Sequence, residues 1–334
     1  MDQRLGTPGA DPSDTGTAAV GDTTVPGAAE PTVKPPSSIL GTVLLGLVAP
    51  LLTGALAAIL VLFVAACLPG APRSRELVSW GLHSAPGLAA LILLQNAMIV
   101  VFAWWLARQR SLPAWSWLRL HLVRLDGTSY LLLLVLAAGV FGLGALAAHW
   151  GRQLGLPGDA TAVNRLIQLM RTAPGMSWLV LVLAMGVGPG FGEEIWVRGH
   201  ILRSLQARCR TRWAILASAV IFTLLHLDPA HMLFALPFGL VFGWLTVRTD
   251  SILPGILCHA FVNSGVNLAR AIEVRRPDYT AEFQTADLHA TDVAALLLLA
   301  AAGVVSVLLL ELRFRQAARV GQEATPAVAS EERP

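Results

Sequence analysis

The chain has 334 residues, of which 55% are hydrophobic and 13% are charged, and its mean hydropathy is +0.63. Soluble domains carry about 25% charged residues, so this composition excludes an ordinary soluble protein. The net charge is only +3, and every basic residue except Lys34 is an arginine.

The two ends of the chain differ in composition from its middle. Residues 1–37 are rich in Gly, Pro, Thr and Ala, and they lack the basic start and short apolar stretch of a cleavable signal. Such a segment cannot bury enough apolar surface to fold, and residues 313–334 have the same character. We therefore expect a disordered N-terminal tail over 1–37 and a disordered C-terminal tail over 313–334.

Between the tails, over 38–312, long apolar runs are separated by short charged segments. A membrane-spanning helix needs about 20 apolar residues. This pattern predicts an all-α, polytopic membrane protein with about eight transmembrane helices. The runs are 38–68, 79–107, 128–147, 177–192, 213–227, 231–247, 251–269 and 293–310.

The arginines predict the orientation of these helices. With the N-terminus inside, the clusters at 108–124 and 203–212 and the arginines after Leu312 all fall on the cytoplasmic side. The positive-inside rule therefore favours a multi-pass protein of the cell membrane with both termini in the cytoplasm. The same bias accounts for the basic pI without a nucleic-acid partner.

Charged residues also occur inside the apolar runs, in the segment "FGEEIWVRGH". Ionisable side chains are costly in a membrane and usually face the bundle interior, where they serve a function. Glu194 and Arg198 are four residues apart, which favours an ion pair on one face of a helix. Glu193 lies about 100° around that helix and is left without this partner.

Two later runs carry polar residues with the same four-residue spacing. Phe222 and His226 lie in "FTLLH", and His259 and Asn263 lie in "HAFVN". Counted from the charged loops at about 1.5 Å per residue, these side chains and Glu193 reach a similar depth. We expect Pro189 and the glycines around it to break the span and start a new helix just before Glu193, with free backbone N–H groups beside that acid.

The three blocks resemble the type II CAAX prenyl protease and bacteriocin-processing (CPBP) family of intramembrane endopeptidases, which includes abortive-infection-like proteins. The family pattern EExxxR, FxxxH and HxxxN matches Glu193-Glu194…Arg198, Phe222…His226 and His259…Asn263, within a core of about 177–268. Each motif alone is short, but the three occur in the family's order. Val197 replaces an aromatic residue that is usual before Arg-Gly, and Pro237 interrupts the linking helix.

The resemblance implies a glutamate-dependent peptidase with its active site between the later helices. In this hypothesis Glu193, assisted by His226, activates water, while His259 and Asn263 stabilise the oxyanion. Glu194, Arg198 and Phe222 support the site. No cofactor is expected. Two histidines and a glutamate are also zinc ligands, but the HExxH spacing is missing and asparagine is a poor zinc ligand.

Structural interpretations remain open for each group taken alone. The Glu–Arg pair is also typical of a buried ion pair, and His226 and Asn263 of hydrogen bonds between helices. We interpret His83, His149, His200 and His231 as interfacial residues. The alternative function is a non-proteolytic immunity or regulatory protein on the same scaffold. The expected partners are the lipid bilayer and a membrane-embedded or lipid-anchored peptide substrate, whose identity and prenylation the sequence does not reveal.

Overall fold

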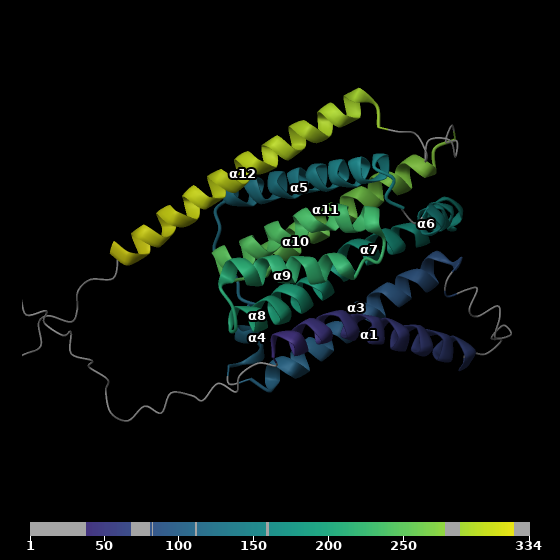
Figure 1. Ribbon diagram of the computed structural model, residues 1–334. Coiled ribbons are helices and arrows are strands. Elements are labelled where there is room, and N and C mark those ends of the chain that lie inside the picture. Colours follow the sequence, from purple (N-terminus) through teal and green to yellow (C-terminus); the bar gives the residue numbers. More distant parts are fainter. Residues whose placement is uncertain are drawn as a thin grey trace, which may run out of the picture. The chain divides into compact units, whose positions relative to one another are not determined.

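A computed structural model describes residues 38–67, 81, 83–110, 112–157, 160–277 and 288–323. Within these ranges the regular structure is entirely helical, as predicted (Figure 1). The elements are α1 (Ile39–Cys67), α3 (Ala85–Arg108), α4 (Ala114–Trp117), α5 (Gly127–Gln153), α6 (Ala160–Thr172), α7 (Ser177–Glu194), the π-helix η1 (Ile195–Leu202), α8 (Arg203–Gln206), α9 (Thr211–Leu224), α10 (Pro229–Thr249), α11 (Leu253–Val274) and α12 (Ala290–Glu323).

The all-α, multi-pass membrane architecture is confirmed, but the count of eight spans is not. Each predicted run overlaps a helix over most of its length, and six helical segments of the described chain are long and apolar enough to cross a membrane. Helix α9, with 14 residues, is too short. Helix α11 has 22 residues but is not among the six, because polar side chains such as His259, Asn263 and Asn267 lower its hydropathy.

Small residues bring several helices into close contact. A Cβ added to Gly139 of α5 would overlap the backbone of Gly303 in α12, and these two helices run side by side in Figure 1. A Cβ on Gly190 of α7 would lie 3.0 Å from the Cβ of Ala260 in α11. Because lipid tails are as apolar as leucine, such close backbone packing is a main source of helix association in membranes.

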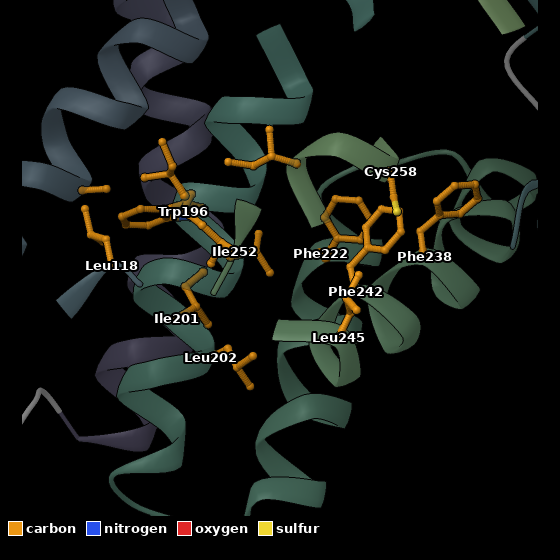
Figure 2. Close-up of a cluster of buried hydrophobic side chains, with 14 of the residues drawn as sticks. Leu118, Trp196, Ile201, Leu202, Phe222, Phe238, Phe242, Leu245, Ile252 and Cys258 are labelled. Atoms are coloured by element: carbon orange, nitrogen blue, oxygen red, sulfur yellow. The ribbon is translucent and has the colours of Figure 1, made fainter. Parts of the chain in front are cut away.

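The larger of two hydrophobic clusters among the described residues includes residues of η1, α9, α10 and α11, and Figure 2 shows part of it. Trp196, Phe222, Phe238 and Phe242 are all at most 4% exposed. Phe222 and Phe242 of this cluster contact Arg198 and His259, two of the polar residues described below.

The expected helix break at Pro189 is wrong. Helix α7 continues through Pro189 to Glu194, and η1 follows directly, so Glu193 lies inside helical structure and not beside a free helix start. The glycines serve packing instead: Gly190 contacts Ala260, and Gly192 lies directly against Asn96 of α3. The irregularity of the span is the π-helix after Glu194, a feature found frequently at functional sites.

The C-terminal helix α12 runs on to Glu323, beyond the boundary expected at Leu312. Two arginines just after Leu312 form ion pairs: Arg313 with Asp126 at 2.6 Å, and Arg315 with Glu311 at 2.8 Å. These contacts explain why the helix persists past the apolar run. The tails over 1–37 and 324–334 lie outside the described residues.

Candidate active site

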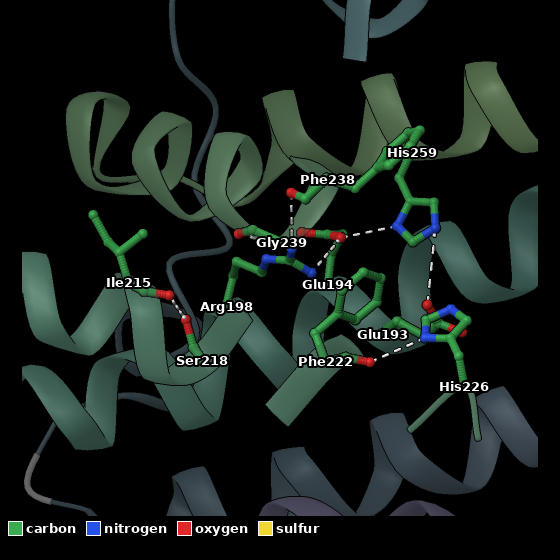
Figure 3. Close-up of polar contacts among 10 residues, drawn as sticks. All are labelled: Glu193, Glu194, Arg198, Ile215, Ser218, Phe222, His226, Phe238, Gly239 and His259. Atoms are coloured by element: carbon green, nitrogen blue, oxygen red, sulfur yellow. Dashed lines mark hydrogen bonds and ion pairs between the residues drawn. The ribbon is translucent and has the colours of Figure 1, made fainter. Parts of the chain in front are cut away.

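Glu194 lies at the centre of the polar network shown in Figure 3, and its side chain is completely buried. Its Oε1 accepts a hydrogen bond of 2.8 Å from Arg198 Nη1, as the four-residue spacing predicts. The same oxygen lies 2.9 Å from Nδ1 of His259 in α11. One carboxylate oxygen therefore links the end of α7, the π-helix and α11.

Arg198 is held on several sides inside the bundle and is also completely buried. Its Nη2 donates to the backbone carbonyls of Phe238 and Gly239 in α10, at 3.2 and 3.3 Å. Its Cζ lies 4.6 Å from the centre of the Phe222 ring, within the range of a cation–π contact. The guanidinium is thus matched by a carboxylate, two carbonyls and an aromatic face, which together offset the cost of burying its charge.

Glu193 differs from its neighbour in both burial and bonding. Its side chain is 35% exposed, and its Oε2 lies 3.8 Å from His259 Nε2, beyond the range of a direct hydrogen bond. The one-residue offset turns it about 100° away from the Glu194–Arg198 pair. The predicted division, in which Glu194 pairs with Arg198 and Glu193 does not, is therefore present in the geometry.

His259 lies between the two glutamates. Its Nδ1 faces Glu194 and its Nε2 faces Glu193, and the residue is 5% exposed. The rings of Phe222 and Phe242 contact the imidazole, with centroids 6.1 and 5.7 Å away. When Nδ1 carries the proton donated to Glu194, the ring orientation is fixed and Nε2 points toward the accessible carboxylate.

His226 lies just beyond the end of α9, not within that helix. Its Nδ1 is 3.0 Å from the carbonyl oxygen of Phe222, and the two rings meet edge to face with centroids 5.0 Å apart. Figure 3 shows His226 on the Glu193 side of the network. The four-residue spacing thus lets the Phe222 carbonyl at the end of α9 contact His226, and this contact fixes the orientation of the imidazole.

Asn263 lies one turn beyond His259 on α11 and is half-buried. Its backbone carbonyl accepts a hydrogen bond of 2.8 Å from Asn267 Nδ2. In the described ranges, its side-chain amide forms no hydrogen bond to another residue. The structure therefore places Asn263 on the same helix as His259 but does not bring its amide into the network.

Three polar residues make contacts that the sequence did not reveal. His231, expected at the interface, contacts His226 with ring centroids 4.5 Å apart. His200, also expected there, is 2% exposed and stacks on Trp196. Asn96 lies against Gly192, next to Glu193. The adjacent amides Gln95 and Asn96, inside an apolar run, were the only sequence signal for that contact.

The site residues come from different elements and do not converge on one point. Among the residues that the structure describes, no group of three or more His, Cys, Asp or Glu side chains is placed to hold a metal ion. The geometry instead arranges the polar groups as a chain, from Arg198 through Glu194 and His259 to Glu193.

Comparison with known proteins identifies this part of the chain. Residues 175–265, which contain all three motifs, match the family described as "Type II CAAX prenyl endopeptidase Rce1-like". This segment is therefore similar to an Rce1-like domain. The resemblance expected from the sequence is confirmed over this stretch, which agrees closely with the predicted core of 177–268.

A curated relative points in the same direction as the Rce1-like domain. The chain is 28% identical over 121 residues to a protein of Bacillus subtilis (strain 168) named "Putative membrane peptidase YdiL". The alignment covers 36% of this chain and 48% of that protein, so the chain spans about half the length of the relative. No solved structure matches the chain significantly.

Proposed function

We propose that the chain is an intramembrane endopeptidase of the glutamic type, in which Glu193 activates the attacking water. The observation that carries this proposal is the different bonding of two adjacent glutamates. Glu194 is buried and paired with Arg198 and His259, whereas Glu193 keeps a side chain that is one-third exposed. A partly accessible carboxylate that no arginine neutralises, inside an apolar bundle, is suited to act as a general base.

In the proposed reaction, the Glu193 carboxylate takes one proton from a water molecule as the water oxygen attacks the carbonyl carbon of the scissile peptide. The carbonyl oxygen becomes an oxyanion. His259 Nε2, in its protonated form, and the side-chain amide of Asn263 donate to that oxyanion. When the C–N bond breaks, the proton held by Glu193 passes to the leaving amine, with His226 assisting.

The remaining residues of the motifs hold these groups in place. Glu194 orients His259 through Nδ1, and Arg198 neutralises the buried Glu194 carboxylate. Phe222 covers the Arg198 guanidinium and supplies the carbonyl that contacts His226. We assign these three residues to structural support and not to the chemical steps.

The reaction is proposed to need no metal or other cofactor. Water activation is assigned to a carboxylate, and the oxyanion is stabilised by nitrogen donors. Zinc chemistry is the competing mechanism, since His226, His259 and Glu193 are residue types that bind this metal. Treatment with a chelator distinguishes the two mechanisms.

The proposed substrate is a peptide segment that is embedded in the membrane or anchored to it by a lipid. The support is the position of the site inside a bundle of apolar helices. The arginine bias of the sequence favours a cytoplasmic position for both termini and for the ends of α3, α8 and α10. Nothing in the site is suited to a nucleic acid.

The proposal is tested by mapping peptide ends on membranes from cells that express the wild type or Glu193→Gln at equal levels. New ends found only with the wild type would support a protease and identify its substrates. Equal sets of ends, with both proteins folded and abundant, would contradict it. That result would favour the non-proteolytic immunity or regulatory role on the same scaffold.

A further inference from the structure

A second cluster of polar side chains contains neither glutamate of the candidate active site, and we call it the arginine–tryptophan cluster: Arg110, Trp117, Arg119 and Arg203. Arg110 and Arg203 both lie over the Trp117 ring, with Cζ 5.0 and 5.3 Å from its centroid. Arg119 follows α4 directly in sequence. Helices α4 and α8, which carry Trp117 and Arg203, lie next to each other in Figure 1.

The cluster contains buried donors without a protein acceptor in the described part of the chain. Trp117 is 4% exposed and Arg119 is 9% exposed. The indole Nε1 of Trp117, Nη1 of Arg119 and Nε of Arg110 are shielded from solvent and have no hydrogen-bond partner there. Buried polar groups are almost always hydrogen-bonded, so several orphan donors in one place indicate that something else satisfies them.

The charges of the cluster are also unbalanced. Asp250, at the end of α10, lies 2.8 Å from Arg119 Nε, but its side chain is 67% exposed. No described carboxylate pairs with Arg110 or Arg203. Burial, and next the like charge of Arg203, lower the pKa of Arg119. Among the described residues, only Arg119 of the three arginines pairs with a carboxylate, and that carboxylate is largely solvated. An additional anion would therefore stabilise the cluster.

The cluster lies at one face of the membrane. Arg110 follows α3, Arg203 begins the last turns of the Ser177–Gln206 span, and Asp250 ends α10. These ends of three candidate spans carry the arginine-rich segments. Phosphate groups of lipids lie at this level, and basic sites between transmembrane helices bind anionic headgroups.

We propose that the arginine–tryptophan cluster is a binding site for a phosphate group. The planar guanidinium groups of Arg110 and Arg203, which are both half-buried, form its accessible edge. Guanidinium donors match phosphate oxygens in pairs. The phosphate is supplied either by the headgroup of an anionic phospholipid or by a soluble phosphate. The inference does not depend on the peptidase activity.

The test uses the full chain in detergent, with native mass spectrometry to measure the Kd of phosphatidylglycerol and of phosphatidylcholine. Arg110→Gln and Arg203→Gln each remove one cation from the edge of the site. Arg210→Gln is the matched control, since it removes an exposed arginine a few residues beyond α8. Melting temperatures confirm folding, and Arg203→Lys replaces Arg203→Gln should the latter not fold. A parallel titration with inorganic phosphate tests competition with the lipid.

We expect Arg110→Gln and Arg203→Gln each to raise the Kd of phosphatidylglycerol about fivefold. This factor corresponds to about 1 kcal/mol per arginine at an anionic surface. The Kd of Arg210→Gln should equal that of the wild type. Competition by inorganic phosphate would support a site that soluble phosphate also fills. Lipid binding without competition would assign the phosphate to the headgroup. The proposal would be overturned if the Kd of phosphatidylglycerol were unchanged in both cluster variants. It would also be overturned if Arg210→Gln raised this Kd as much as the cluster variants do.

Discussion

Glu194 and Arg198 form an ion pair of 2.8 Å in which both side chains are fully shielded from solvent. Their neighbour Glu193 shares the helix but not the pair. Replacing a buried ion pair by apolar residues is often neutral, but removing one partner alone leaves an uncompensated charge. The two glutamates are therefore expected to respond differently to the same substitution.

We predict that Glu194→Gln destabilises the protein by about 3–5 kcal/mol, the usual cost of leaving one buried charge unpaired. The buried Arg198 would lose its carboxylate and His259 its fixed orientation. Thermal unfolding of the purified chain measures the effect, with Glu193→Gln as the matched control. A melting temperature equal to that of the wild type would contradict the structural role of Glu194.

Gly139→Leu should loosen the contact between α5 and α12. Any side chain at this position meets the backbone of Gly303, and overpacking of this kind costs about 1–3 kcal/mol. Gly265→Leu is the control, because the space around Gly265 is open. Unfolding temperatures and protease sensitivity of α12 would show the difference. Similar behaviour of the two variants would argue against this close contact.

The fold was largely predictable because the dominant signal, long apolar runs, is local in sequence. Each predicted run corresponds to a helix over most of its length. The span count was not predictable for two reasons. Helix α9 has only 14 residues, and polar side chains of α11, among them His259 of the network, lower the hydropathy of that helix. The continuity of α7 through Pro189 was missed because it depends on packing of its glycines against α3 and α11.

The site was predictable as far as helical spacing determines it. The Glu194–Arg198 pair and the separate position of Glu193 follow from the angle between successive helical residues. The contact of Glu194 with His259 joins residues far apart in sequence, so no local pattern reveals it. The same reason explains why the contact of His231 with His226 was missed.

A pH-dependent contact is predicted where α12 meets the start of α5. Asp126 caps α5 by accepting a hydrogen bond from the Ser129 backbone N–H, and it pairs with Arg313. These contacts, the Ser129 bonds first, lower the pKa of Asp126 from 3.8 to about 2. Because the folded pKa is depressed, the stabilisation is complete well above pH 3.8 and is lost as the pH falls toward 2.

Asp126→Asn keeps a capping side chain but removes the charge. We expect it to melt below the wild type at neutral pH, with a small difference that shrinks as the pH falls through the window between 3.8 and about 2. The charge contribution should also weaken in high salt, since the pair is exposed. A difference that stayed constant from neutral pH to pH 2 would contradict the assignment.

Removal of metal ions tests whether the proposed cleavage reaction depends on zinc. We predict that cleavage of a substrate by the purified chain persists after treatment with EDTA or 1,10-phenanthroline, because water activation is assigned to Glu193. The control is a zinc peptidase treated in parallel. Activity that disappears with chelator and returns with added zinc would support the metal mechanism and overturn the proposed one.

The most direct test of the account is the cleavage rate of a substrate peptide by the chain in proteoliposomes, measured for wild type, Glu193→Gln and Glu193→Asp. Loss of a positioned general base costs about 10²–10⁴-fold in rate. We predict such a loss of rate for Glu193→Gln, whose melting temperature should equal that of the wild type. Glu193→Asp should keep partial activity. A folded Glu193→Gln variant that cleaves at the wild-type rate would show that Glu193 is not the base.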